Sequence, residues 1–243
     1  MLIEKIKKLI VKDPDTFFKE LEFLNGGIYS FLNPYSYNVL RGNIKFDINK
    51  LDGLFVDGIL LVLMLKFINI KTKRYSFDNT SAANLVFKFS ELKNKKVFLI
   101  GSKSKEIKKS SENFLKVYPK LNIVGYRNGY FTPNEKGIII ENILKLSPDI
   151  VVVGMGTPMQ ESFLIDLKEK GFQGIGFSCG GFLHQSSKKV NYFPKIINKL
   201  HLRFLYRMFK EKEIFYRNLR TYPVFLYNFL FDILNERKNI SNR

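Results

Sequence analysis

The chain has 243 residues, 45% of them hydrophobic, which is enough for one large domain with a buried core, alone or with an appendage. Lysine and arginine number 40 against 22 aspartates and glutamates. The resulting formal charge of +18 indicates an anionic partner: nucleic acid, a phosphorylated substrate or an anionic membrane. The single cysteine, Cys179, excludes an internal disulfide and a zinc site built on a cysteine cluster, and it fits the reducing cytoplasm.

Membrane-spanning and export signals are the next features to test. Charged residues interrupt the N-terminal segment MLIEKIKKLIVKD, which therefore lacks the continuous apolar stretch of a signal peptide. The longest apolar runs, residues 59–65 and 224–234, are shorter than the roughly 20 residues that cross a bilayer. We therefore expect a cytoplasmic protein without a spanning segment. Binding to a membrane surface is a separate question.

Helices and strands can be predicted along much of the chain. Asp13 and Pro14 predict a helix start, because an aspartate cap precedes a proline whose missing N–H is harmless there, and Gly26 and Gly27 are expected to end this helix. Between residues 96 and 177, apolar runs, glycine or proline breaks and polar-faced helical stretches follow one another. This pattern predicts four buried strands, in KVFLIGSK, NIVGYRNGY, DIVVVGMGTP and GIGFSCGG, and helices over 105–117, 135–146 and 159–170.

Strands rich in valine and isoleucine that alternate with helices imply βαβ crossovers. We therefore predict an α/β, Rossmann-like fold with a mainly parallel sheet and flanking helices. Ligands of such sheets bind at the carboxyl ends of the strands. The glycines expected at those ends are Gly101, Gly125, Gly129, Gly154, Gly156 and Gly180. Each of them fits a plain turn equally well.

From residue 188 onward, basic and apolar residues are interleaved with few acids, which predicts basic amphipathic helices. We divide the chain into a Rossmann-like core, residues 1–190, and this helical appendage, residues 191–243. Lys195, Lys199, Arg203 and Arg207 recur every four residues and form one stripe of a helix. The stripe is either the solvated face of a helix packed on the sheet or a contact for lipid phosphates or a nucleotide diphosphate.

Two polar residues follow apolar, strand-like runs. Asp57 lies between such a run and an apolar helix-like run, where it suits a helix N-cap or a general base that takes a proton from an acceptor hydroxyl. Asn33 precedes Pro34, and it suits a turn or cap, or an amide that hydrogen-bonds a sugar or base. The sequence alone does not choose between these interpretations.

The segment VGMGTPMQES combines a strand end with a helix start. It places Gly154, Gly156 and Thr157 after the most hydrophobic strand, a suitable site for an anion or a sugar. Gln160 and Glu161 then belong to the first helical turn. The segment lacks the third glycine of a dinucleotide fingerprint and the lysine of a P-loop.

Other chemical signals are weak. Asp13 and Asp15 have the DxD spacing that elsewhere holds a divalent metal on a nucleotide diphosphate, but a helix cap explains them better. His184 and His201 lack an acidic cluster that would make a metal site, and Cys179 has no histidine beside it and fits a small core residue. We expect no metal or cofactor. Aromatic RNA-binding signatures are absent, so the positive charge fits a membrane better than nucleic acid.

Several segments together resemble the WecG/TagA/CpsF family, glycosyltransferase family 26, and its capsule or surface-polysaccharide branch in particular. These segments, within residues 25–225, are FLNPYSYNVL, LFVDGILLV, RYSFDNTSAANLVF, GYRNGYF, DIVVVGMGTPMQESFL, GFSCGGFLHQSSKK and YFPKIINKLHLRFLYRMFKEKEIFYR. The resemblance implies a Rossmann-like domain with a C-terminal appendage. It also implies inverting, metal-independent transfer of a hexose or N-acetylhexosamine from a nucleotide sugar, expected to be UDP-linked, to a polyprenyl-diphosphate-linked saccharide.

The resemblance also assigns roles to individual residues. It implies that Asp57 is the catalytic base and that Asn33 belongs to the substrate pocket. Gln160 and Glu161 match an element near the sugar nucleotide. In the appendage, the arginines that match those closing over the diphosphate are Arg207 and Arg217, with Arg203 and Arg220 as further companions.

These inferences combine into one expected mechanism. Asp57 deprotonates the acceptor hydroxyl as it attacks the anomeric carbon, and the appendage arginines stabilise the departing diphosphate. The basic appendage holds the enzyme on the inner face of the cell membrane. A homo-oligomer is a separate expectation. The competing hypotheses are a non-catalytic protein that binds anionic lipid or nucleic acid, and a nucleotide-sugar oxidoreductase or epimerase, which the missing dinucleotide fingerprint disfavours.

Overall fold

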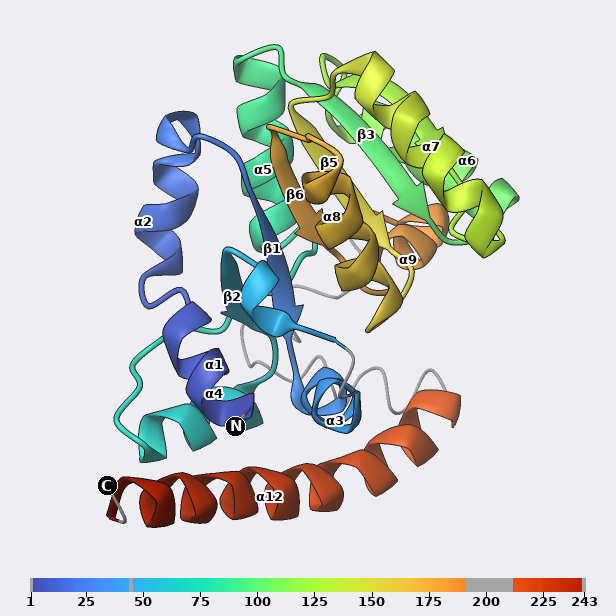
Figure 1. Ribbon diagram of the computed structural model, residues 1–243. Helices are drawn as coiled ribbons and strands as arrows, with labels where there is room; N and C mark the ends of the chain where they lie inside the picture. The colour runs from blue at the N-terminus through green and yellow to red at the C-terminus, as the bar shows by residue number, and fades with distance from the viewer. Residues whose placement is uncertain (1, 44–45, 191–211, 242–243) are drawn as a thin grey trace.

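A single parallel sheet forms the centre of the molecule (Figure 1). The computed structural model describes residues 2–43, 46–190 and 212–241. Within these ranges the strand order is β2-β1-β6-β5-β3-β4, and every pair of neighbours is parallel. The strands are β1 (Gly27–Leu32), β2 (Gly53–Val56), β3 (Lys96–Gly101), β4 (Asn122–Arg127), β5 (Ile150–Gly154) and β6 (Ile175–Ser178). The predicted α/β, Rossmann-like fold is confirmed.

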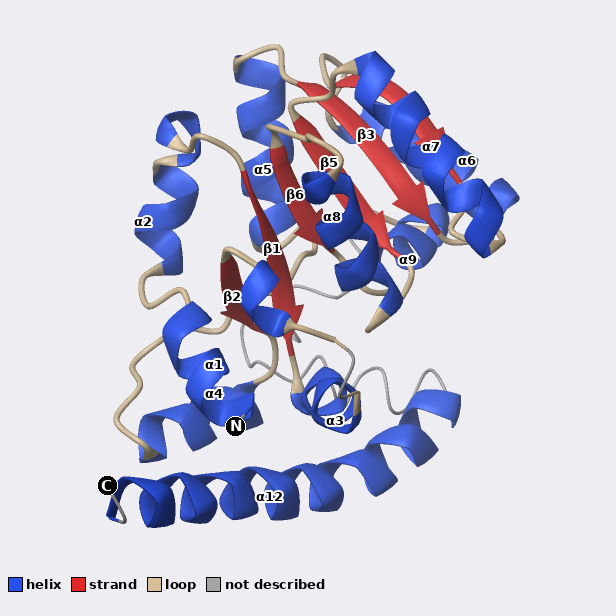
Figure 2. Ribbon diagram, in the orientation of Figure 1, coloured by secondary structure: helices blue, strands red, loops and turns tan. Residues whose placement is uncertain are grey.

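Helices cover both faces of the sheet, and each face has its own hydrophobic core (Figure 2). In β3, Val97 and Leu99 join one core, while Phe98 and Ile100 join the other, as the two-residue period of a strand requires. The first core also receives side chains of α2 (Pro14–Lys19), α5 (Ala82–Leu92), α6 (Ser104–Val117) and α9 (Phe182–Lys188). The second receives those of α1 (Leu2–Leu9), α3 (Pro34–Gly42), α4 (Ile59–Phe67), α7 (Pro133–Leu146) and α8 (Met159–Glu169).

The predicted elements are found with two corrections. The strand in NIVGYRNGY is not fully buried: β4 lies at the edge of the sheet, and most of its residues are only half-buried. Asp13 caps α2 as expected, but the helix ends at Lys19, before a short 3-10 turn at Leu21–Phe23. Gly27 therefore opens β1 instead of ending a helix.

The C-terminal helix α12 (Lys212–Ser241) runs across one end of the molecule, beside α3 and α1 (Figure 1). Phe225, Phe229 and Ile233 are buried in the same core as the side chains of α1 and α3. Pro223 lies inside the helix, just before this docked part. The described part of the appendage, α12, thus contributes to the core. The predicted domain boundary between residues 190 and 191 adjoins residues outside the described ranges and stays a prediction.

A buried acid attaches α12 to α3. The hydroxyl of Tyr37 donates to Oδ2 of Asp232 at 2.6 Å, and Nε of Arg41 lies 3.0 Å from both carboxylate oxygens. Lys7 of α1 forms an ion pair with Glu236, one turn further along α12. Burial and the Asp232 carboxylate raise the pKa of Tyr37. The described helices include none that is long and apolar enough to span a bilayer.

Loss of a buried aromatic ring from α12 is expected to destabilise the whole fold. Phe229→Ala leaves a cavity in the core and should lower the free energy of unfolding by about 3–5 kcal/mol. Phe23→Ala, at a side chain that is 78% exposed, should change it by less than about 0.5 kcal/mol. Chemical denaturation followed by circular dichroism measures both values, and equal small losses would show that α12 does not contribute to the core.

Candidate active site

A cleft of about 1200 Å³ follows the carboxyl edge of the sheet. Residues that end or follow every one of the six strands line it, and α12 contributes to its wall. These residues include Asn33 after β1, Asp57 after β2, Ser102 after β3, Gly129 after β4, Gly154 at the end of β5 and Cys179 after β6, with Arg217 and Tyr222 from α12. A parallel sheet is expected to bind its ligand at this edge.

Asp57 lies directly after β2, where its backbone N–H donates to the carbonyl of Leu32 at 2.8 Å. The N-cap of α4 is Gly58 and not Asp57, so the N-cap interpretation of Asp57 is wrong. The carboxylate lines the cleft, is 35% exposed and lies 3.8 Å from Nη2 of Arg74. The pKa of Tyr222, which also lines the cleft, is raised mainly by burial and further by the negative charge of Asp57. The group is therefore accessible and oriented, as a general base must be.

Asn33 forms the helix cap that the sequence suggested. Its Oδ1 accepts from the backbone N–H of Ser36 at 3.0 Å, while the Ser36 hydroxyl accepts from the backbone N–H of Asn33, and together they form a capping box at the start of α3. The cap prediction is confirmed. Asn33 also lines the cleft, and its Nδ2 amine makes no hydrogen bond with any residue that the structure describes. The amide is thus held by its oxygen at the cleft wall.

The glycines of the predicted crevice divide into two groups. Thr157 and the predicted glycines Gly129, Gly154, Gly156 and Gly180 line the cleft, whereas Gly125 lies within β4 and not at its end. Gly101 does not line it: a Cβ there would lie 2.2 Å from the carbonyl oxygen of Gly154, so this glycine lets β3 and β5 approach closely. We interpret Gly101 as a packing residue that shapes the floor of the cleft.

Gln160 and Glu161 occupy different depths. Gln160 lines the cleft, with its Oε1 accepting from the N–H of Gly180 at 3.0 Å and its Nε2 donating to Glu161 at 2.8 Å. Glu161 is only 1% exposed and also accepts from the hydroxyls of Ser30 and Thr157. Burial raises the pKa of Glu161. Glu161 therefore holds two cleft residues in place from behind and does not itself line the cleft.

The predicted arginines are only partly described. Arg217 lines the cleft, and its guanidinium lies 4.9 Å from the centre of the Tyr35 ring. Arg220 is exposed on the same helix and is not among the residues that line the cleft. Arg203 and Arg207 lie outside the described residues. Among the described residues, a cation that sequence reasoning missed is Arg74, which lines the cleft and is 13% exposed.

A histidine–carboxylate pair in the cleft was also missed. Nδ1 of His184 lies 3.0 Å from Oε1 of Glu106, while the hydroxyl of Ser102 and the backbone N–H of Lys103 donate to Oε2. Burial alone would raise the pKa of Glu106, but these hydrogen bonds outweigh it and lower the pKa to about 2. No periodicity or spacing links α6 to α9, so the pair could be found only from the folded chain.

Metal-binding groups are not found in the described residues. No cluster of three or more histidine, cysteine or acidic side chains occurs in these ranges. Asp13 caps α2, and Asp15 pairs with Lys73 and Tyr75, and neither lines the cleft. The helix-cap interpretation of this DxD spacing is therefore confirmed for Asp13. Cys179 is buried at the cleft wall, and burial raises the pKa of its thiol.

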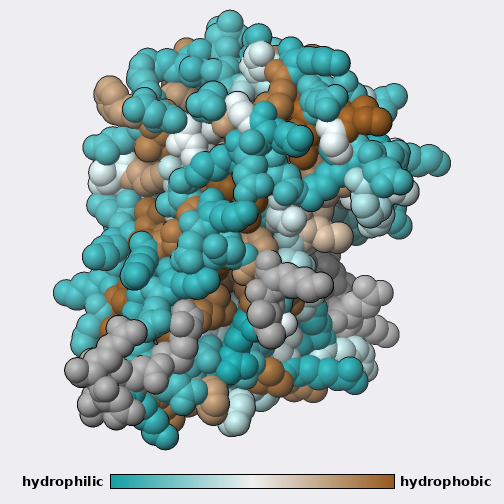
Figure 3. Space-filling view, in the orientation of Figure 1, coloured by the Kyte–Doolittle hydropathy of each residue, from teal (hydrophilic) through white to brown (hydrophobic). Residues whose placement is uncertain are grey.

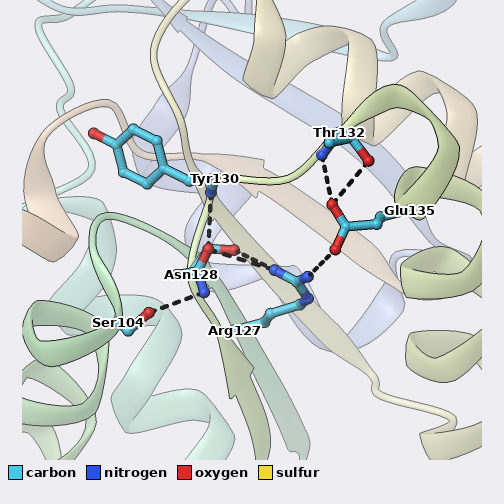
Figure 4. A network of polar contacts seen from close by, with 6 residues as sticks. All are labelled: Ser104, Arg127, Asn128, Tyr130, Thr132 and Glu135. Atoms are coloured by element: carbon cyan, nitrogen blue, oxygen red, sulfur yellow. Dashed lines mark hydrogen bonds and ion pairs between the residues drawn. The ribbon is translucent and has the colours of Figure 1, made fainter.

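A polar network fixes the loop between β4 and α7 at the rim of the cleft (Figure 4). Oδ1 of Asn128 accepts from the backbone N–H of Tyr130 at 3.0 Å, and its Nδ2 donates to the hydroxyl of Ser104. Arg127 contacts Asn128 and Glu135, which forms a capping box with Thr132. The Tyr130 ring points away from this network, is 68% exposed and lines the cleft. The held loop thus places an exposed aromatic ring at the cleft.

The Glu106 carboxylate should stabilise the fold in a pH-dependent way. Because folding lowers its pKa from 4.5 to about 2, its contribution is complete above pH 4.5 and is lost as the pH falls toward 2. Glu106→Gln should lower the free energy of unfolding by roughly 1–3 kcal/mol at pH 7, and by progressively less below pH 4.5. Urea titrations at several pH values measure this difference. The control is Glu112→Gln, at an exposed acid of the same helix, and an equal loss in both variants would contradict the assignment.

Comparisons with known proteins agree with this geometry. The model of the "Glycosyl transferase WecG/TagA/CpsF family" matches residues 16–239. The chain is 37% identical over 206 residues to the UDP-Gal:alpha-D-GlcNAc-diphosphoundecaprenol beta-1,4-galactosyltransferase of Shigella boydii, covering 84% of this chain and 86% of that one. It is 26% identical over 191 residues to the N-acetylglucosaminyldiphosphoundecaprenol N-acetyl-beta-D-mannosaminyltransferase of Bacillus subtilis (strain 168), covering 75% and 71%. The chain therefore belongs to the WecG/TagA/CpsF family and is a glycosyltransferase.

Proposed function

We propose that this enzyme transfers a hexose or N-acetylhexosamine from a UDP-sugar to a polyprenyl-diphosphate-linked saccharide in bacterial surface polysaccharide synthesis. The observation that carries the proposal is the Asp57 carboxylate at the end of β2, in a cleft that collects the carboxyl ends of all six strands. The names of both relatives include an N-acetylglucosamine linked to diphosphoundecaprenol, which supports the acceptor class. The first name also includes UDP-Gal, which supports a UDP-linked hexose donor.

The reaction is a single displacement with inversion at the anomeric carbon. The acceptor hydroxyl oxygen attacks this carbon and its proton passes to Asp57, while the bond to the diphosphate oxygen breaks and UDP leaves with the electron pair from the opposite face. Arg74, 3.8 Å from Asp57, orients the carboxylate. No resident metal takes part in this scheme, so fixed cations must stabilise the leaving charge.

The described residues suggest how the donor lies in the cleft. Tyr130 offers an aromatic platform for the base at the rim, and the backbone of Gly156 and Thr157 precedes α8, where an anion is favoured. Arg217 supplies a planar, bidentate donor for the diphosphate from α12. We propose the same contact with the diphosphate for Arg203, Arg207 and Arg220. The Asn33 amide is proposed to donate a hydrogen bond to the sugar.

We also propose peripheral binding to the inner leaflet of the cell membrane, where a lipid-linked acceptor is reached. The chain carries a formal charge of +18. Large apolar side chains are exposed along α12, and some hydrophobic residues show at the lower edge of the molecule, where this helix lies (Figure 3). The exposed apolar side chains of α12 include Tyr216, Leu219, Val224, Tyr227 and Leu234. Apolar side chains beside basic ones suit an anionic leaflet. A homo-oligomer stays a prediction.

The general base is tested by an isosteric change. Asp57→Asn keeps the shape of the side chain but cannot accept the proton, so kcat should fall by about 100-fold or more while the affinity for UDP-sugar is kept. Turnover of lipid-linked acceptor, followed by product mass, and donor binding by calorimetry measure the two quantities. Asp13→Asn is the control, because asparagine caps a helix as well as aspartate and Asp13 does not line the cleft. Unchanged turnover in Asp57→Asn would remove this residue from the mechanism.

The proposed contact of Arg217 with the diphosphate is tested in the presence of a chelator. Arg217→Gln removes charge and geometry, so both kcat and the affinity for UDP should fall by roughly 10-fold or more, whereas Arg217→Lys should recover part of each. Initial rates and UDP inhibition constants are measured in EDTA. Inactivity of the wild-type enzyme in EDTA would contradict metal-independent transfer, and an unchanged Arg217→Gln enzyme would exclude this arginine from the diphosphate site.

A further inference from the structure

Helix α4 has an unusual composition for a surface helix. Every residue of Ile59–Phe67 except Lys66 is apolar. Leu61 and Leu65 are fully buried and anchor the helix on the core. A surface helix with one buried stripe normally carries polar residues on its outer face, whereas this helix is apolar there as well. The fold therefore explains only the inner face of α4.

The outer face of α4 forms a continuous apolar stripe. Ile59, Leu63 and Phe67 are 37%, 55% and 69% exposed, and their spacing of four residues places them in one row along the helix. The row extends for about 12 Å, at 1.5 Å per residue. Exposed apolar rows of this kind mark binding surfaces when they join a site.

The stripe begins at the proposed catalytic group and leads out of the cleft. Ile59 is the second residue after Asp57, and Ile59, Leu60 and Leu63 all line the cleft. Phe67, at the end of α4, is not among the cleft residues and is the most exposed of the row. A molecule that places its reacting hydroxyl at Asp57 therefore has an apolar path toward solvent on one side.

We propose that this face of α4, defined by Ile59, Leu63 and Phe67, binds the polyprenyl chain of the lipid-linked acceptor. The inference rests on the proposed function, because only that function supplies a substrate with a sugar at one end and a long hydrocarbon at the other. Lys66, beside Phe67 at the end of α4, is exposed, and its charge suits the passage of the chain into an anionic leaflet.

The position of the stripe favours a single lipid chain over other occupants. Leu63 belongs to the cleft wall and to the exposed surface at once, so the occupant must enter the cleft as well as cover the helix. A lone hydrocarbon chain can do both. The surface of a bilayer cannot enter the cleft, and a second copy of the protein seated there would close it.

The kinetic test compares two acceptors that carry the same sugar diphosphate on a long polyprenyl chain or on a short alkyl chain. Leu63→Gln and Phe67→Gln should each raise KM for the long-chain acceptor by roughly tenfold, because each removes one apolar contact that becomes buried when the chain binds. In Phe67→Gln, which lies outside the cleft, KM for the short-chain acceptor, KM for the donor and kcat should be unchanged. The matched controls are Leu92→Gln and Phe23→Gln, at exposed residues of other elements, which should change nothing.

A binding test does not depend on turnover. The chain has no tryptophan, so Phe67→Trp and the control Phe23→Trp each give a single fluorescent reporter. Polyprenyl diphosphate without a sugar, added in detergent, should give a saturable blue shift in Phe67→Trp that detergent alone does not give, and none in Phe23→Trp. If the wild type transfers sugar to neither acceptor while this shift saturates, the proposed function fails and the lipid site stands.

Three results would overturn the inference. Equal changes in KM for the long and short acceptors would show that α4 acts through the shape of the cleft. Loss of vesicle co-sedimentation by Leu63→Gln in the absence of acceptor would show that the face meets the bilayer. A wild-type dimer in sedimentation that Leu63→Gln dissociates would assign the face to a second copy of the chain.

Discussion

The direction of the strands is the constraint on which the site depends. Because all six run parallel, their carboxyl ends meet at one edge, and residues from distant parts of the chain arrive at the same cleft. Asp57 and Gly154 are brought together in this way. Close approach of β3 and β5, allowed by Gly101, sets the floor of the cleft, and the buried Glu161 fixes Gln160 and Thr157 above it.

Helix α12 connects the cleft with the core. Its first half supplies Arg217 and Tyr222 to the cleft, and its second half is anchored by Phe229 and by the contacts of Asp232 with α3, with Pro223 between the two. A buried carboxylate needs partners, and Asp232 finds them only when α12 lies against α3. The position of Arg217 in the cleft is thereby tied to the stability of the fold.

Apolar surface at the cleft has a distribution that folding alone does not require. The outer row of α4 starts beside Asp57, and exposed apolar side chains also follow α12. Both helices line the cleft. Under the proposed function, recognition of a lipid-linked acceptor would extend from Asp57 to the edge of the molecule, and a soluble sugar would use only part of that surface.

The order of amino acids by itself determined the parallel α/β core, the bounds of α6, α7 and α8 to within about two residues, and the strand-end positions of Asp57 and Gly154, because apolar periodicity is a local property. The tertiary structure decided which polar groups meet: Arg74 beside Asp57, His184 beside Glu106, and Asp232 beneath α3. It also decided that Glu161 is buried and that β4 is an edge strand. These outcomes depend on contacts between residues far apart in the chain, which no local pattern constrains.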